Sequence, residues 1–193
     1  MSSAKERILE AASELFSQKG YAAVSVREIA KRANCSHTSI YVYFQDKRGL
    51  LEALALPPIQ DLNKALTRIN QEPGLSNVER LVRMSEEYVS FGFKYLRLYE
   101  TFMTVEATKV DAEANTALNQ QRLEIFHVFQ NVFEEITDDP ALDFNRILFY
   151  LLHGTVMTYI HTDEPIENVA ERVLPLVRTS VNLLVKGGQY DEN

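Results

Sequence analysis

The sequence predicts an all-α protein of about nine helices, and three observations indicate this class. Helix-start signals recur along the chain, and apolar residues repeat at helical spacing between them. No strand-like alternation of useful length is present, and we find no internal repeat or low-complexity tract. Proline and glycine interrupt the helical pattern at intervals and predict the loops.

The N-terminal segment is predicted to begin with two capped helices. Ser3 and Glu6, and again Ser25 and Glu28, have the spacing of a capping box, in which the serine accepts from the N3 amide and the glutamate reaches back. Between them, helical apolar spacing predicts a first helix that Gly20 ends.

Residues 24–44, VSVREIAKRANCSHTSIYVYF, are predicted to form two short helices joined by a tight turn. If Ile40 points inward in the second of them, Thr38 and Val42 point outward, with Ser39 and Tyr41 beside them. This outward face carries no acid, whereas a surface helix normally carries mixed charge. Such a face suits the major groove of DNA, where the second helix of a helix-turn-helix lies.

A resemblance to a known family starts from the run CSHTSIYVYFQDKRGLL. It resembles the end of the DNA-binding domain of TetR-type transcriptional repressors, whose pattern is roughly V-S-x-x-T-(L/I/V)-Y-x-(H/Y)-F-x-x-K-x-x-L. The upstream run AAxELFxxKGYxxVSVREIAKRA is also similar. Cys35, Ser39 and Val42 depart from the pattern, which bears on base preference. The resemblance implies a helix-turn-helix domain over residues 1–50 and a helical ligand-binding and dimerisation domain over residues 51–193.

Helix geometry and the resemblance together predict the residues that contact DNA. The start of the second short helix is where base edges are reached, while Tyr41, Tyr43 and Lys47 resemble the backbone contacts of the family. Val42 could meet a thymine methyl or be a harmless exposed valine, and Ser25 could do no more than cap its helix. The predicted DNA-binding residues are Ser25, Arg27, His37, Thr38, Ser39, Tyr41, Val42, Tyr43 and Lys47.

Beyond residue 50, the helical pattern is expected to break at several places. Pro57 and Pro58 should bend or restart their helix, because proline has no amide donor and clashes with the preceding turn. The spacing at residues 76–79 predicts another capping box. Breaks at residues 138–140 and 162–165 then separate the last two long helices.

An aromatic set in this second region is either core or the wall of a pocket for an apolar small molecule. The runs YVSFGFKYLRLYETFM and YLLHGTVMTYI look like ligand-domain segments of one TetR subgroup. For any single residue, packing in the core is the alternative to ligand contact. The candidate ligand-binding residues are Tyr88, Phe91, Tyr95, Tyr99, Phe102, Met103, Phe126, Tyr150, His153 and Met157.

Composition narrows the class of protein further. The net charge is −7, and residues 1–54 carry 8 basic and 6 acidic side chains, so a small positive region is confined to the N-terminal end. Apolar runs are too short to span a membrane, and the single cysteine fits a cytoplasmic protein. No catalytic, metal-ligand or cofactor motif is present, so neither enzyme nor cofactor is expected.

The sequence therefore favours a homodimeric transcriptional repressor that binds a near-palindromic double-stranded operator. The resemblance implies release by a small lipophilic effector. Two alternatives remain open at this point. One is an activator or a regulator without a ligand; the other is a helical binding or enzymatic protein whose N-terminal resemblance is inert.

Overall fold

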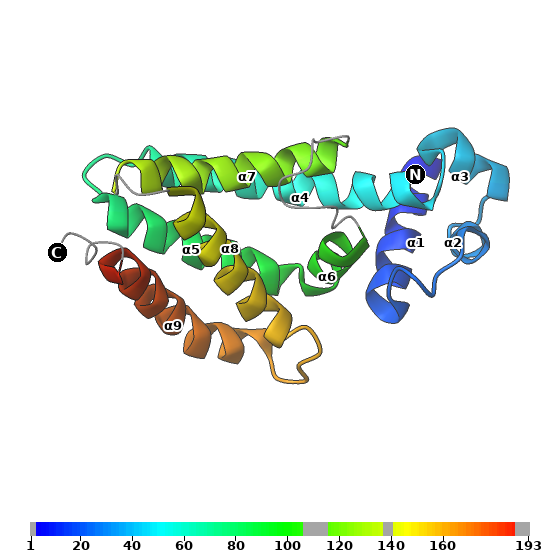
Figure 1. Ribbon diagram of the computed structural model, residues 1–193. Helices are drawn as coiled ribbons and strands as arrows, with labels where there is room; N and C mark the ends of the chain where they lie inside the picture. Colours follow the sequence, from blue (N-terminus) through cyan, green and yellow to red (C-terminus); the bar gives the residue numbers. More distant parts are fainter. Residues whose placement is uncertain (1–2, 106–115, 137–140, 188–193) are drawn as a thin grey trace. The chain divides into compact units, whose positions relative to one another are not determined.

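The computed structural model describes residues 3–105, 116–136 and 141–187. Over these residues the chain forms nine helices and no strand, which confirms the all-α prediction (Figure 1). The helices are α1 (Ala4–Lys19), α2 (Val26–Arg32), α3 (His37–Phe44), α4 (Lys47–Asn70), α5 (Asn77–Lys94), α6 (Leu96–Val105), α7 (Ala117–Glu134), α8 (Ala141–Thr158) and α9 (Ile166–Gly187).

Internal contacts divide the chain into two compact units. The first comprises Met1–Ile59 and Arg97–Asn119, and the second comprises Gln60–Leu96 and Gln120–Asn193. The first domain was predicted to end at residue 50, whereas the first contact unit continues to Ile59. Beyond residue 50, Ala53 and Leu54 on the first turns of α4 also pack against the core of the first unit.

Serine caps define the helix starts of the first unit, as predicted. The Ser3 hydroxyl accepts from the Glu6 amide at 3.2 Å, while a Glu6 carboxylate oxygen accepts from the Ser3 amide at 2.8 Å. The same reciprocal pair forms between Ser25 and Glu28. Each box satisfies amides that the first turn of a helix leaves without an intrahelical partner.

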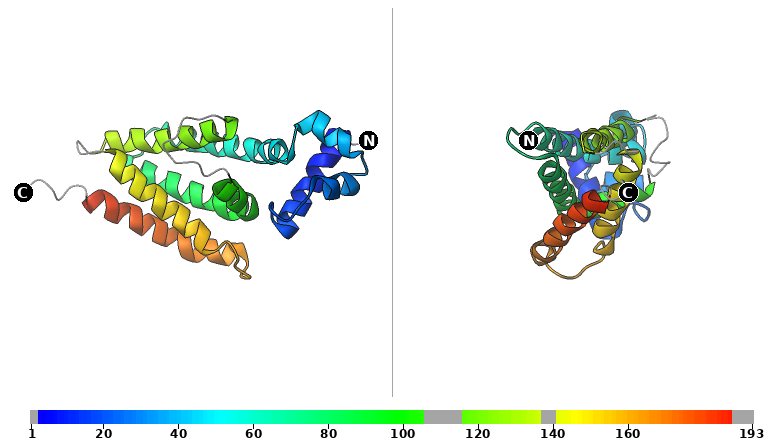
Figure 2. Two further views of the ribbon diagram at one scale, coloured as in Figure 1. Left: turned by 45° about the vertical axis from the view of Figure 1, so that its right-hand side comes forward. Right: turned by 60° about the vertical axis from the view of Figure 1, so that its left-hand side comes forward.

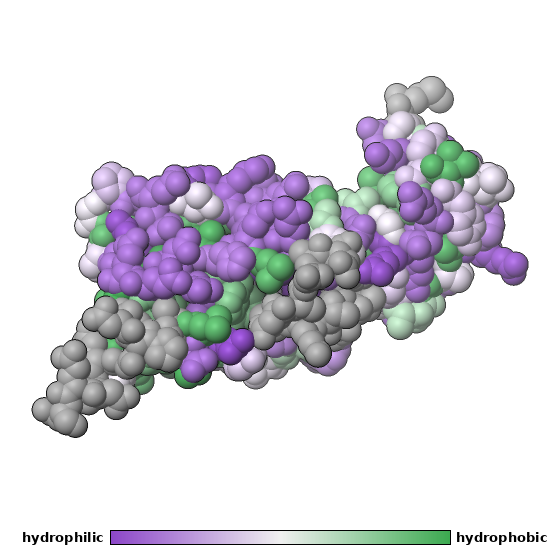
Figure 3. All heavy atoms as spheres, turned by 45° about the horizontal axis from the view of Figure 1, so that its top comes forward, coloured by the Kyte–Doolittle hydropathy of each residue, from purple (hydrophilic) through white to green (hydrophobic). Residues whose placement is uncertain are grey.

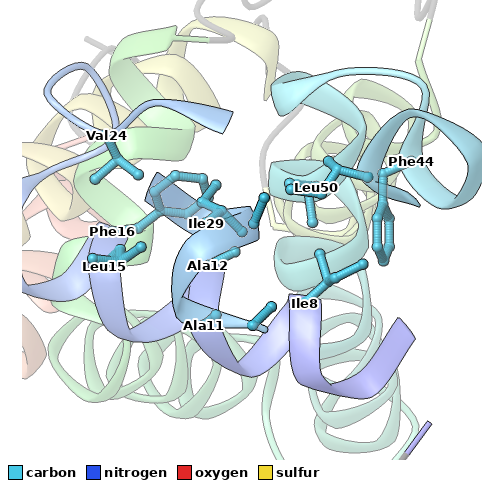
Figure 4. Packing of buried hydrophobic residues seen from close by; sticks show 12 residues of the cluster. Ile8, Ala11, Ala12, Leu15, Phe16, Val24, Ile29, Phe44 and Leu50 are labelled. Carbon is cyan, nitrogen blue, oxygen red and sulfur yellow. The ribbon is translucent and has the colours of Figure 1, made fainter. Parts of the chain in front are cut away.

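A small apolar core holds α1, α2 and α3 together (Figure 4). Ile8, Ile29 and Ile40, one from each of these helices, are fully buried there. Tyr21 packs against the edge of this core, in the loop between α1 and α2. The burial of Ile40 fixes which side of α3 turns outward.

The joint between α3 and α4 is tight. Gln45 has a positive φ of 63°, and the Asp46 amide donates to the Phe44 carbonyl at 2.7 Å across it, as in a γ-turn. The Asp46 carboxylate then caps α4 by accepting from the Gly49 amide at 2.7 Å. A Cβ at position 49 would overlap the Phe44 carbonyl oxygen, so glycine is required there.

The helix was predicted to bend or restart at Pro57 and Pro58. It does not restart, because α4 runs unbroken through both prolines. Each proline removes only its own amide donor, and the apolar residues on either side remain buried. Ala55 is fully buried and Ile59 is 2% exposed. Burial of these neighbours offsets the two lost hydrogen bonds.

In the second unit, α5 packs against both α8 and α9, which also pack against each other (Figure 2). Gly92 makes the close approach possible, since a Cβ there would lie 2.6 Å from a Val156 methyl. A valine on every fourth residue gives α9 its buried stripe. The stripe consists of Val169, Val173, Val177, Val181 and Val185.

Ion pairs connect α5 to α9 on the surface of this unit. The Arg178 guanidinium donates to Glu79 at 3.1 Å and to Glu86 at 3.0 Å. The Ser76 hydroxyl caps α5, but the reciprocal half of the predicted capping box is absent from its N-cap geometry. The carboxylate of Glu79 pairs with Arg178 and Arg83 instead.

Candidate nucleic-acid interface

The start of α3 is shaped by a pair of serines. The Ser36 hydroxyl accepts from the Ser39 amide at 3.1 Å, and the two hydroxyls lie 2.7 Å apart. Ser39 is therefore half-buried and engaged in the helix cap. His37 and Thr38, on the same turn, are exposed.

The outward side of α3 continues with three large exposed residues. Val42 is 74% exposed, and Tyr41 and Tyr43 are 44% and 47% exposed. The ring of His37 meets Tyr41 edge-on with centroids 4.9 Å apart, so these two side chains hold each other. Together these three side chains form an exposed apolar and aromatic patch, and such patches mark interaction sites.

On α2 the two predicted positions behave differently. The Ser25 hydroxyl is occupied by the capping box, whereas Arg27 is exposed on the first turn. Hydrogen bonds from the Ser25 backbone and from Lys19 lower the pKa of Glu28 to about 2. Glu28 thus remains anionic at the edge of this surface and is held by its neighbours.

Several basic side chains of the first unit are paired. Lys19 contacts Glu28 at 2.9 Å, and Arg32 contacts Glu14 at 2.5 Å. Lys47 has a different neighbour, since its ammonium lies 4.2 Å from the centre of the Tyr21 ring. Partial burial lowers the pKa of Lys47, and the nearby charge of Glu28 acts in the opposite direction.

The candidate ligand residues do not form one cluster. Tyr88 and Phe126 are buried, and both rings meet Phe149, at 5.5 and 5.8 Å between centroids. Phe91 and Tyr95 form a separate, partly exposed pair at 5.0 Å. Both groups lie in the second unit. The Tyr88 and Phe126 group is part of its core.

The remaining candidates are scattered. Tyr150 is 63% exposed, in contrast to the buried rings of Tyr88 and Phe126 in the same unit. Tyr99 is buried but belongs to the first unit. His153 and Met157 are half-buried, and burial followed by the charge of Arg122 lowers the pKa of His153. The side chains of Phe102 and Met103 lie outside the described residues.

A polar groove between α4 and α7 was missed by the sequence analysis. It encloses about 570 Å³ and lies within the second unit. The Asn63 amide donates to the backbone carbonyl and side-chain oxygen of Gln121 at 3.0 and 2.8 Å, joining its two walls. Figure 3 shows how hydrophilic the face over α7 is. A polar stripe at helical spacing from Gln60 to Gln71 was the available signal.

Within the described ranges, no helix is long and apolar enough to cross a membrane. The same residues contain no group of three histidine, cysteine or acidic side chains that could hold a metal ion.

These features define a helix-turn-helix protein whose second short helix presents an exposed face, followed by a separate helical unit. Residues 8–54 match the family model of the bacterial regulatory proteins of the tetR family. The helix-turn-helix region of this chain belongs to the TetR family.

Two curated relatives and one solved structure illustrate the similarity. The chain is 31% identical over 137 residues to the probable HTH-type transcriptional regulator YttP of Bacillus subtilis, covering 69% of this chain and 64% of that protein. It is 28% identical over 96 residues to IcaR of Staphylococcus aureus, a negative regulator of the biofilm operon icaADBC, covering 49% and 51%. The chain thus spans less than two thirds of either relative's length.

The fold is shared with the TetR family transcriptional regulator PfmR of Thermus thermophilus. The TM-score is 0.69 at 19% identity, over 93% of this chain and 97% of that one. At this identity the likeness establishes the fold alone.

Proposed function

We propose that this chain is a DNA-binding transcriptional repressor that acts as a homodimer on a near-palindromic operator and is released by a small lipophilic effector. The exposed, acid-free side of α3 carries this proposal. A folded unit that leaves Val42 74% exposed beside two tyrosines offers a surface for another polymer. In this proposal the protein works in the cytoplasm and has no enzymatic activity.

The roles of the interface residues follow from their positions. His37, Thr38 and Val42 occupy the exposed start and outward side of α3, where side chains reach base edges. Tyr41, Tyr43 and Lys47 are assigned to phosphates, together with Arg27 on α2. The Ser39 and Ser25 hydroxyls stabilise the ends of their helices first, because both already take part in caps.

Selection of bound sequences from a random duplex pool, followed by footprinting, tests DNA binding directly. Tyr41→Phe and Lys47→Ala should weaken binding to selected and random duplexes by similar factors, since phosphate contacts carry no sequence information. Lys64→Gln, on the exposed side of α4 in the second unit, is the matched loss of charge and should leave affinity unchanged. No protected site and no retained pool would refute the proposal.

Val42 permits a sharper test. If its side chain meets a thymine methyl, replacing that thymine by uracil in the selected operator should weaken binding several-fold. The Val42→Ala protein should bind the two operators about equally. Equal loss in both proteins would show that the methyl is sensed elsewhere.

Exposed apolar residues on α8 and α9 support the homodimer. Ile147 and Tyr150 on α8 are 50% and 63% exposed, and Leu176 and Leu183 on α9 are 60% and 65% exposed. Such a face can be covered by the same face of a second copy around a two-fold axis. Light scattering should give a dimer that Leu183→Glu dissociates, whereas Asn131→Glu on the exposed side of α7 should not. A folded wild-type monomer at micromolar concentration would contradict this assembly.

The proposed effector would bind in the second unit. Its support is the aromatic content of the second unit, in which Phe91, Tyr95 and Met157 remain partly accessible. Thermal-shift screening with lipophilic compounds, with and without operator, tests it. A true effector raises the melting temperature of the free protein and lowers its affinity for the operator. A compound that does only the first is a ligand without a regulatory role.

Repression is distinguished from activation by where the operator lies and what loss of the protein does. Deleting the gene should raise transcription from the bound promoter. A fall in transcription would favour the activator alternative while leaving the DNA-binding assignment intact.

A further inference from the structure

We propose that Tyr21 is a positioning residue for DNA binding: its ring holds the Lys47 ammonium in place for a DNA phosphate. The inference rests on the proposed DNA-binding function and names a residue outside the helix-turn-helix pair. Tyr21 follows Gly20 in the loop between α1 and α2, and Lys47 is the first residue of α4.

The contact is close and its platform is fixed. The Lys47 Nζ atom lies 4.2 Å from the centre of the Tyr21 ring, well inside the range of about 6 Å over which a cation is attracted by an aromatic face. The Tyr21 ring in turn packs on Phe16 with centroids 5.2 Å apart, and Phe16 is buried in the core. The position of the ring is therefore set by the core of the first unit.

The other end of the Lys47 side chain is also fixed. Lys47 is the first residue of α4, directly after the Asp46 cap and the turn at Gln45, so its backbone position is set. A lysine that is free in solution must lose side-chain entropy when it contacts a phosphate. Because the backbone and the ammonium of Lys47 are both held in place before DNA binds, Lys47 loses less side-chain entropy on binding.

Glu28 is the acidic neighbour that could have taken Lys47 into an ion pair, but its oxygens are engaged elsewhere. One accepts from Lys19 at 2.9 Å, and the other accepts from the Ser25 amide at 2.9 Å and hydroxyl at 3.0 Å. An aromatic face attracts the ammonium without accepting an N–H bond in the way a carboxylate does. The N–H donors of Lys47 thus remain available for phosphate oxygens.

Lys5 provides an internal control. It also lies over an aromatic ring, but at 6.0 Å from the centre of Phe44, at the limit of the interaction. Both lysines belong to the first unit and carry the same charge. Loss of Lys5 should therefore report the general effect of removing a cation, without coupling to Tyr21.

A double-mutant cycle tests the proposal with a random-sequence duplex of about three helical turns, roughly 30 base pairs. Tyr21→Leu should weaken binding about two- to fivefold when Lys47 is present and should have no effect in the Lys47→Gln background. Tyr21→Phe, which keeps the ring, should stay within about twofold of the wild type. Lys5→Gln should give the same factor with and without Tyr21→Leu.

If Tyr21→Leu fails to fold, changing the charge distribution of the ring at position 21 provides a second test. Phenylalanine and pentafluorophenylalanine at position 21 fill similar volumes, but fluorination removes the negative face of the ring. Binding should be weaker for the fluorinated protein, and only while Lys47 is present.

Three results would overturn the inference: equal effects of Tyr21→Leu in both Lys47 backgrounds, equal affinities of the two phenylalanine analogues, or tighter binding after loss of the ring. Tighter binding would mean that the ring competes with DNA for the ammonium. A wild-type protein that binds no duplex would instead refute the proposed function, so the two failures are distinguishable.

Discussion

The two units of the molecule are stabilised on different length scales. In the first, Ser3, Ser25 and Ser36 each bond a residue three positions away, and the interface helix is fixed by its own cap. The second unit adds long-range polar links to its local caps: Arg178 reaches Glu79 across 99 residues of sequence, and Asn63 reaches Gln121 across 58. Local order in the first unit leaves one side of α3 exposed, whereas the second unit couples distant helices to one another.

This difference has a consequence for how each unit responds to change. Substituting an exposed residue of α3, such as Val42, touches neither the caps nor the core, so recognition can vary without loss of stability. In the second unit, one side chain such as Arg178 contacts two carboxylates at once. A change there removes two ion pairs between α5 and α9 rather than a single contact.

The largest effect should come from Gly49→Ala in the first unit. Its new Cβ would overlap the Phe44 carbonyl oxygen, a backbone atom that no rotamer change can move. We expect a loss of about 3 kcal/mol in the free energy of unfolding. Gly154→Ala, where no atom lies within 4 Å, is the matched control and should stabilise α8 by about 0.5–1 kcal/mol. Denaturant unfolding measures both, and equal effects would contradict the strict joint between α3 and α4.

Gly92→Ala should come next, and it sharpens the comparison because its clash is with a side chain. The added methyl would lie 2.6 and 2.8 Å from the two Val156 methyls, so α5 and α8 must separate or Val156 must turn. We expect a loss of about 1–3 kcal/mol. Val156→Ala introduced with Gly92→Ala should recover part of it, by a coupling that the cycle of four proteins measures. An additive double mutant would show that the two residues do not meet.

Arg178→Gln should have a smaller effect. Its partners Glu79 and Glu86 would lose their ion pairs, but all three groups are partly exposed, so we expect about 1 kcal/mol or less. High salt should shrink the difference between variant and wild type. Arg172→Gln removes an exposed pair with one carboxylate, Glu164, and a contact with the Tyr159 ring, and should cost less still. A salt-independent loss would point to packing of the arginine stem rather than to charge.

The first unit could be predicted closely from sequence because its determinants are local. Serine and glutamate three residues apart gave the caps, and helical spacing placed Ile40 inward and Val42 outward, as observed. The continuity of α4 through Pro57 was missed because it depends on burial of Ala55 and Ile59, which sequence spacing does not show.

The second unit was harder because its contacts link residues far apart. The carboxylate of Glu79 was assigned to a capping box, but Arg178, distant in sequence, takes it instead. Tyr150 was grouped with the other aromatic residues of this region as core or pocket wall, although it is 63% exposed on α8. Its solvent-facing register is set by which side of α8 packs on α5, and that pairing is not encoded locally.

The smallest expected effect at neutral pH, and the most specific to the first unit, is the pH dependence of Glu28. Its pKa is about 2 in the folded chain against an ordinary value of 4.5, chiefly because the Ser25 backbone donates to it. A carboxylate whose pKa is lowered by folding stabilises the folded state above its unfolded pKa. That contribution is lost as pH falls from about 4.5 towards 2.

Glu28→Gln should therefore reduce the difference in stability between about pH 5 and about pH 2.5 relative to the wild type, because a glutamine does not titrate. These two pH values bracket the range in which the contribution of Glu28 is lost. Hydrogen exchange of the α2 amides, which report this helix alone, is the measurement. Glu10→Gln on the exposed side of α1 is the control and should leave the acid sensitivity of α2 unchanged. If the α2 amides of wild type and Glu28→Gln lost protection in parallel on acidification, the cap would not be the source of the pH dependence. Loss of protection on acidification that is confined to α2 and absent in Glu28→Gln would instead assign the pH dependence to the Ser25–Glu28 capping box at the start of α2.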